Sequence, residues 1–249
     1  MSGAAPEPDA GAHHRAPELA GIPRVDLLEC AWVPGAPNAR GAPGSLLLLH
    51  GFGDDGTALR GIGDALCPAG TLAVYPTLRA HGGSPFPEWG YSPLDFAADI
   101  HRIADAFPRP VHVVGHSYGA LIAAISAVML GPDRIGSVAL LDQSFEPFED
   151  RYEADEWAEA SFLKWHYDYT HLFDSLTALG IPVLTVIARE SPVVPAEERE
   201  RMLARRGDKF SCVLAGGTHK GFLQRSAAEI LRDFYGHHFP KAPPLETCT

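Results

Sequence analysis

The sequence has few cysteines and few positive charges, and both scarcities exclude classes of protein. Four cysteines occur among 249 residues, and they are scattered with no pair at C-x-x-C spacing. Such spacing gives neither a disulfide framework nor a zinc knuckle, so reduced thiols are expected. The 20 Lys and Arg residues stand against 31 Asp and Glu, a formal charge of −11. Because nucleic acids and anionic membranes bind basic surfaces, neither is expected as a partner.

Long hydrophobic segments are also missing from the sequence. No stretch reaches the roughly 18 uninterrupted apolar residues of a membrane-spanning helix. Residues 1–21 are rich in Ala, Pro, Gly and acidic side chains, without the basic and apolar regions of a secretory signal. A cytoplasmic location is therefore expected. The abundance of Ala, Gly, Pro and Arg is typical of a GC-rich bacterial source.

What the chain does contain is an alternation of short apolar runs and helical patterns. The run at Ser45–Leu49 is typical of a buried parallel strand. Further strands are expected at Val25–Val33, Thr71–Tyr75, Val111–Val114, Ser137–Leu141, Pro182–Ile187 and Phe210–Leu214. Helices are expected between them at Thr57–Leu66, Leu94–Phe107, Tyr118–Leu130, Ala196–Arg205 and Ser226–Tyr235. This alternation predicts an α/β fold with a mostly parallel central sheet flanked by helices on both faces.

One interval breaks the alternation. Nearly 40 residues separate the strand that ends at Leu141 from the next one, which is more than a simple crossover needs. Aromatic residues alternate there with Glu and Asp, which favours a small helical cap over the carboxyl edge of the sheet rather than a long helix packed on it. The predicted organisation is a disordered arm at 1–22, a core of 23–142 and 180–238, a cap at 143–179 and a frayed tail at 239–249.

The pentapeptide Gly115-His116-Ser117-Tyr118-Gly119 is the most informative motif in the chain. It is a G-x-S-x-G sequence between an expected strand and an expected helix, which is the context of a nucleophile elbow. Side chains at the two glycines would collide with the neighbouring strand or helix, and the serine is held in a strained conformation that exposes its hydroxyl. Ser117 is therefore the candidate nucleophile, and His116 is expected to point away from its hydroxyl.

Together with two further motifs, the pentapeptide resembles the α/β-hydrolase superfamily over about residues 25 to 238. These motifs are His50-Gly51-Phe52-Gly53, after the first core strand, and Gly216-Gly217-Thr218-His219, late in the chain. The resemblance implies an α/β-hydrolase fold with Ser117 as nucleophile and His219 as its base. It also implies an oxyanion hole formed by the backbone N–H groups of Phe52 and Tyr118.

The acid of the triad departs from the common pattern of this superfamily. Ser191 occupies the position, a few residues past the strand ending at Ile187, where an Asp is frequent. A serine cannot stabilise an imidazolium as a carboxylate does. Asp142, which directly follows another expected strand, is favoured as the substitute, and Glu190 is the alternative acid. A Ser–His dyad without a carboxylate is a third possibility.

These residues predict acyl transfer through a serine-bound intermediate. Ser117 would attack a carbonyl, His219 would move the proton, and water would release the acid from a carboxylic ester or thioester of a largely apolar small molecule. No cofactor and no metal is implied, and the sequence does not define an oligomeric state. Two other functions stay open: a lyase that eliminates a carboxylate from an acylated biosynthetic intermediate, and a non-catalytic protein that binds a small ligand.

Overall fold

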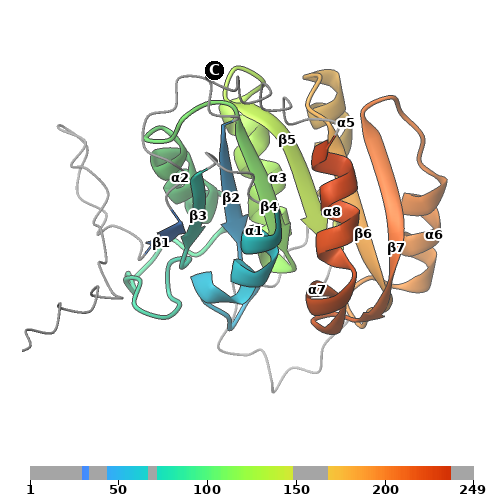
Figure 1. Ribbon diagram of the computed structural model, residues 1–249, viewed down its shortest axis with the longest axis horizontal. Helices are drawn as coiled ribbons and strands as arrows, with labels where there is room; N and C mark the ends of the chain where they lie inside the picture. Colours follow the sequence, from blue (N-terminus) through green and yellow to red (C-terminus); the bar gives the residue numbers. More distant parts are fainter. Residues whose placement is uncertain (1–29, 34–43, 67–71, 148–167, 237–249) are drawn as a thin grey trace, which may run out of the picture.

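The structure is a computed structural model that describes residues 30–33, 44–66, 72–147 and 168–236. These residues form one sheet with the strand order β1-β3-β2-β4-β5-β6-β7 (Figure 1). The strands are β1 (Cys30–Val33), β2 (Ser45–Leu49), β3 (Leu72–Pro76), β4 (Val111–His116), β5 (Ile135–Leu141), β6 (Val183–Glu190) and β7 (Phe210–Thr218). β1 pairs antiparallel with β3, and all other pairs are parallel. The predicted α/β fold with a mostly parallel sheet is confirmed.

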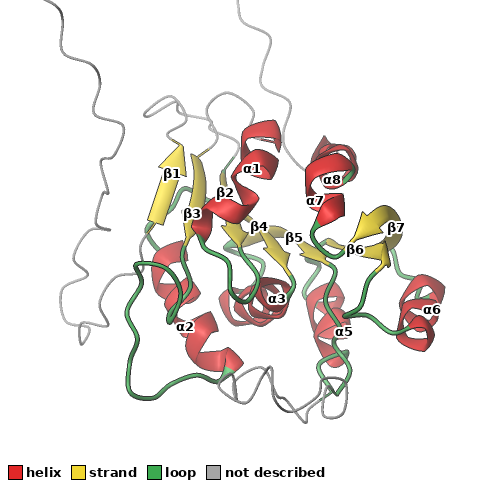
Figure 2. Cartoon of the chain, turned by 90° about the horizontal axis from the view of Figure 1, so that it is seen from below, coloured by secondary structure: helices red, strands yellow, loops and turns green. Residues whose placement is uncertain are grey.

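Helices cover both faces of the sheet. They are η1 (Gly56–Leu59), α1 (Arg60–Leu66), α2 (Pro93–Ala104), α3 (Tyr118–Leu130), α5 (His171–Ala178), α6 (Ala196–Ala204), α7 (Gly221–Arg225) and α8 (Ala227–Gly236). Figure 2 shows α2, α3 and α5 on one face and α1, α7 and α8 on the other. The buried apolar residues accordingly form two clusters, one on each face. The helix α7 was not predicted, because its five residues are too few to give a helical period.

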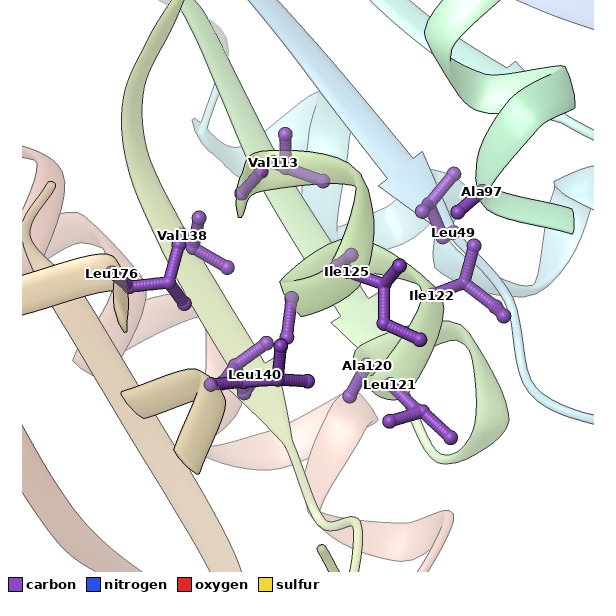
Figure 3. Packing of buried hydrophobic residues seen from close by; sticks show 14 of the residues in the cluster. Leu49, Ala97, Val113, Ala120, Leu121, Ile122, Ile125, Val138, Leu140 and Leu176 are labelled. Carbon is purple, nitrogen blue, oxygen red and sulfur yellow. The ribbon is translucent and has the colours of Figure 1, made fainter. Parts of the chain in front are cut away.

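The helix α3 lies at the centre of one of these clusters. Its sequence is apolar on all sides, which is typical of a helix that is completely enclosed. It packs on Leu49 of β2, Val113 of β4 and Leu140 of β5 (Figure 3). Because α3 begins directly after Ser117, this packing gives the candidate nucleophile a rigid support.

A buried ion pair ties the segment after β3 to α2. Arg79 donates from Nε to Asp99 Oδ2 at 2.6 Å and from Nη2 to Oδ1 at 2.8 Å. The two residues are only 8% and 4% exposed, respectively. Arg79 also donates to the backbone oxygen of Gly90. These contacts place Arg79 in the framework of the loop between β3 and α2.

We expect Asp99→Asn to lower the free energy of unfolding by about 3 to 5 kcal/mol, because it leaves the Arg79 guanidinium buried without its counter-charge. Arg102 supplies the control, since it reaches Asp99 at 3.4 Å from a side chain that is 38% exposed. Arg102→Gln should cost at most about 1 kcal/mol. Urea unfolding measures both, and equal losses would contradict a dominant role for the Arg79 pair.

The part of the expected cap that the structure describes includes the helix α5, which packs into the core. The apolar side chains Leu172, Phe173 and Leu176 of α5 are buried in the same cluster as α3. Residues 148–167, which make up most of the expected cap, lie outside the described residues, as do the expected arm at 1–22 and tail at 239–249. The cap therefore stays a prediction. None of the described helices is long and apolar enough to cross a membrane.

Candidate active site

Ser117 lies in the turn between β4 and α3 and has an unusual backbone. Its φ of 52° and ψ of −130° fall outside the regions that non-glycine residues favour. A conformation of this kind costs about 1 to 3 kcal/mol and persists only where the surroundings enforce it. Two backbone hydrogen bonds do so here: Ser117 N donates to Leu141 O at 2.8 Å, and Ala120 N donates to Ser117 O at 2.7 Å. The predicted strained elbow is present.

The two glycines of the elbow are required by close backbone contacts. A Cβ atom at Gly115 would lie 2.2 Å from the carbonyl oxygen of Gly119, and one at Gly119 would lie 2.3 Å from that of Leu49. Both distances are far below any van der Waals contact. The spacing G-x-S-x-G thus follows from how tightly the turn packs on β2 and on itself.

Asp142 and His219 are brought together although they are 77 positions apart in the sequence. The Nδ1 atom of His219 lies 2.7 Å from Asp142 Oδ2. Asp142 follows β5 directly, is fully buried, and accepts a second hydrogen bond on Oδ1 from Ala188 N at 2.8 Å. An ionised carboxylate only accepts, so the proton of His219 lies on Nδ1 and the basic lone pair lies on Nε2. This is the tautomer that a general base for a serine hydroxyl needs.

The two other residues considered for the acid position have different surroundings. Glu190 is at the end of β6 and its side chain is exposed. The hydroxyl of Ser191 donates to Asp142 Oδ2 at 2.8 Å. The position at which the superfamily often has an acid therefore holds a hydrogen-bond donor to the carboxylate of Asp142. Of the two candidate acids, Asp142 is the one that contacts His219.

His116, which was not expected to take part in the site, packs directly on His219. The two ring centroids are 4.6 Å apart and the planes are tilted by 37°. His116 Nε2 lies 2.9 Å from the backbone oxygen of His219, so it carries a proton and donates. Burial, followed by the charge of His219, lowers the pKa of His116 to about 3. His116 is therefore a neutral support for the candidate base.

The segment after β2 lies beside Ser117. A Cβ atom at Gly51 would be only 3.0 Å from the Cβ of Ser117, so a side chain at this position would crowd the nucleophile. Phe52 comes next and is half-buried, with its ring edge-on to that of His81 at 5.6 Å. Tyr118 begins α3, where backbone N–H groups point out of the helix. Its side chain is buried against Phe96. Of the two predicted oxyanion donors, Tyr118 follows Ser117 in the sequence, and Phe52 follows Gly51, which lies beside Ser117 in space.

Hydrogen bonds of His50 connect the segment after β2 to the segment that follows β3. Its Nε2 accepts from Leu78 N at 2.9 Å, which leaves Nδ1 to donate to Gly51 O at 2.7 Å. Burial is the main cause that lowers the pKa of His50, to about 4. A protonated His50 would lose the bond to Leu78, because its Nε2 would no longer accept.

The lowered pKa values of His50 and His116 predict that the protein loses stability in acid. The ordinary pKa of a histidine is 6.5, and burial lowers it to about 4 for His50 and about 3 for His116 in the folded protein. Below about pH 6.5 the unfolded chain takes up protons that the folded chain does not, so stability is present above that pH and falls toward the folded values. The expected slope is about 1.4 kcal/mol per pH unit for each histidine.

Urea unfolding of wild type and His50→Gln across about pH 7.5 to about pH 4.5 measures this effect. The variant should show a smaller loss of unfolding free energy on acidification than wild type. His171 has an exposed side chain, so His171→Gln is the control and should keep the wild-type slope. An unchanged slope in His50→Gln would contradict the assignment.

The polar groups around His219 hold the carboxylate of Asp142 against its ring. Within the described ranges, His, Cys, Asp and Glu side chains do not gather in a group of three or more that would hold a metal ion. The polar groups at the site instead form a chain from Ser191 through Asp142 to His219. Such a chain is suited to orienting the imidazole of His219 and stabilising the positive charge that it gains when it takes up a proton.

The fold, the elbow and the Asp–His pair define a hydrolase of the α/β type. The sequence matches the alpha/beta hydrolase family over residues 46–233. The chain therefore belongs to the alpha/beta hydrolase family, as its motifs indicated.

The individual proteins that resemble this chain match it at low sequence identity or over only part of its length. An epoxide hydrolase from Caballeronia sordidicola is 34% identical over 109 residues, which make up 43% of this chain and 33% of that protein. The match therefore spans about a third of the relative's length. The thioesterase domain from the curacin biosynthetic pathway has a TM-score of 0.60 at 20% identity, over 84% of this chain and 99% of that domain. A thermophilic esterase from Thermogutta terrifontis has a TM-score of 0.65 at 18% identity, over 86% and 95%. These two structures share the fold.

Proposed function

We propose that the protein is a serine hydrolase that cleaves a carboxylic ester or thioester through an acyl-enzyme intermediate. The observation that carries the proposal is the 2.7 Å contact between His219 Nδ1 and the fully buried Asp142, together with a serine that is held at a φ of 52° and directly follows His116, whose ring packs on His219. In this mechanism, His219 Nε2 takes the proton from Ser117 as its oxygen attacks the carbonyl. The N–H groups of Phe52 and Tyr118 stabilise the oxyanion. His219 then returns the proton to the leaving group, and water hydrolyses the acyl-enzyme.

The nucleophile also distinguishes between ester cleavage and epoxide opening. A carboxylate that opens an epoxide forms an ester, and water can hydrolyse that ester at its carbonyl. A serine that opens an epoxide forms an ether, which has no carbonyl for water to attack. Attack of Ser117 on an acyl carbonyl leads to a hydrolysable intermediate, so ester or thioester cleavage is favoured over epoxide opening.

Exposed aromatic residues on a segment that leaves the same edge of the sheet as Ser117 support a largely apolar acyl substrate. The segment between β3 and α2 leaves the carboxyl edge of the sheet, as Ser117 does, and carries two exposed aromatic residues. Phe86 is 70% exposed and Trp89 is 80% exposed. Phe52 adds a half-buried ring. The formal charge of −11 disfavours polyanionic substrates.

Hydrolysis of p-nitrophenyl esters of graded chain length, together with an acyl thioester and a styrene epoxide, tests the proposal. We expect turnover of the ester and thioester and none of the epoxide, with an optimum chain length that reports the size of the acyl site. Product analysis separates the other functions: an olefin in place of an alcohol would indicate a lyase. Binding of the esters without turnover would indicate a ligand-binding protein.

A further inference from the structure

We propose that Ser191 is a positioning residue of the active site, whose hydroxyl holds the Asp142 carboxylate for His219. The inference rests on the proposed function, in which His219 is the base. Ser191 follows β6 directly, and its Oγ lies 2.8 Å from Asp142 Oδ2. The same oxygen receives His219 Nδ1 at 2.7 Å. One atom of Asp142 thus joins the two side chains.

The direction of the Ser191 hydrogen bond is fixed by its other contacts. The backbone N–H groups of Val193 and Val194 both donate to Ser191 Oγ, each at 3.1 Å. A hydroxyl has two lone pairs and one hydrogen. Because both lone pairs are occupied, the hydrogen points to Asp142. Ser191 is therefore an obligatory donor, and it favours the ionised, accepting form of the carboxylate.

This donor matters because Asp142 is fully buried. A carboxylate without water needs hydrogen bonds to keep its charge. In the described residues these bonds come from Ala188 N on Oδ1 and from Ser191 and His219 on Oδ2. Ser191 and His219 both donate to Oδ2, so the negative charge on this oxygen is divided between two hydrogen bonds. Removing the hydroxyl would therefore leave more of that charge to bind the imidazolium form of His219, and His219 would take up its proton at a higher pH.

The contacts of the other ionisable groups around His219 do not involve Ser191, so substituting Ser191 leaves those contacts in place. His116 is neutral on one side of the ring. Lys220, next in the chain, pairs with Asp54 at 2.6 Å, and the side chain of Glu190 is exposed. None of these groups contacts Ser191 Oγ in the described residues. A shift in the pH profile caused by Ser191→Ala would thus report the hydroxyl.

We expect Ser191→Ala to lower kcat/KM near neutral pH by about tenfold and to move the acid limb of its pH profile up by about 0.5 to 1 pH unit. Ser191→Thr retains a hydroxyl and should stay within about threefold of wild type, with an unmoved limb. Ser126 of α3 supplies the matched control: it is fully buried, and its Oγ has no hydrogen-bond partner among the described residues. Ser126→Ala should leave both readings unchanged.

A double-mutant cycle tests whether Ser191 acts through Asp142. If it does, Ser191→Ala should change kcat/KM by less than about twofold in an Asp142→Asn background, although it costs about tenfold in wild type. Equal losses in the two backgrounds would overturn the proposal. Should Ser191→Ala not fold, Ser191→Cys replaces it, since a thiol is only a weak donor and the same shift is expected.

Proton NMR of the His219 Nδ1–H signal provides a reading that does not depend on turnover. We expect this signal to titrate at a higher pH in Ser191→Ala than in wild type. An unmoved titration, with only the melting temperature changed, would show that Ser191 merely holds the turn and would overturn the proposal. If wild type cleaves no ester and binds no fluorophosphonate, the proposed function fails, while the NMR titration still decides the role of Ser191.

Discussion

Ser117→Ala is expected to lower kcat for ester hydrolysis by about 10⁴- to 10⁶-fold, because it removes the only atom that forms the acyl-enzyme in the proposed mechanism. The fold should persist, since the elbow is held by backbone bonds from Ser117 N to Leu141 and from Ala120 to Ser117 O. Initial rates with the best p-nitrophenyl ester measure the loss, and thermal unfolding checks the fold.

The control for this variant is Ser126→Ala, which removes a buried hydroxyl from α3 and leaves the elbow intact. It should retain wild-type kcat. If Ser117→Ala kept more than about 1% of wild-type turnover in protein of proven purity, covalent catalysis by Ser117 would be refuted.

Asp142→Asn is expected to lower kcat/KM by about 10³- to 10⁴-fold. The amide oxygen can accept from Ala188 N, as Asp142 Oδ1 does. The NH₂ group then faces both the Ser191 hydroxyl and His219 Nδ1, which are themselves donors. The contact to His219 is therefore lost, or the imidazole adopts the tautomer whose Nε2 carries a proton and cannot act as a base.

Glu190→Gln is the matched comparison for this prediction. Glu190 is exposed at the end of β6, so its variant should keep kcat/KM within about twofold of wild type. A large loss in Glu190→Gln with a small one in Asp142→Asn would move the acid to Glu190. Small losses in both would indicate a Ser–His dyad.

The sequence was sufficient to predict the elements whose patterns are continuous. β2 and α3 begin and end at the predicted residues, because an unbroken apolar run has few alternatives to a buried strand or an enclosed helix. The pattern of the segment 143–179 does not distinguish a cap from a helix of the core. Aromatic residues serve equally in a cap and in a core, and in α5 the side chains of Phe173 and Leu176 pack into the core cluster.

The candidate site could be proposed from the sequence as far as residue types and their order allowed. Ser117 and His219 stand in recognisable motifs, and Asp142 was favoured because it directly follows a strand. The contacts made by His116 and Ser191 were not predictable. The stack of two imidazole rings depends on how the ends of β4 and β7 align, and the hydroxyl that donates to a distant carboxylate depends on the ends of β5 and β6; no local pattern records either alignment.

The most direct test of the account is intact mass spectrometry of wild type and Ser117→Ala after exposure to a fluorophosphonate and to a slowly hydrolysed p-nitrophenyl ester. We predict one phosphonyl group, and transiently one acyl group, on wild type and neither on Ser117→Ala. Asp142→Asn should form the phosphonyl adduct far more slowly than wild type, because its His219 is a poorer base. Folded wild-type protein that forms no adduct, or Ser117→Ala that forms the same adduct, would contradict an activated Ser117 as the centre of the chemistry.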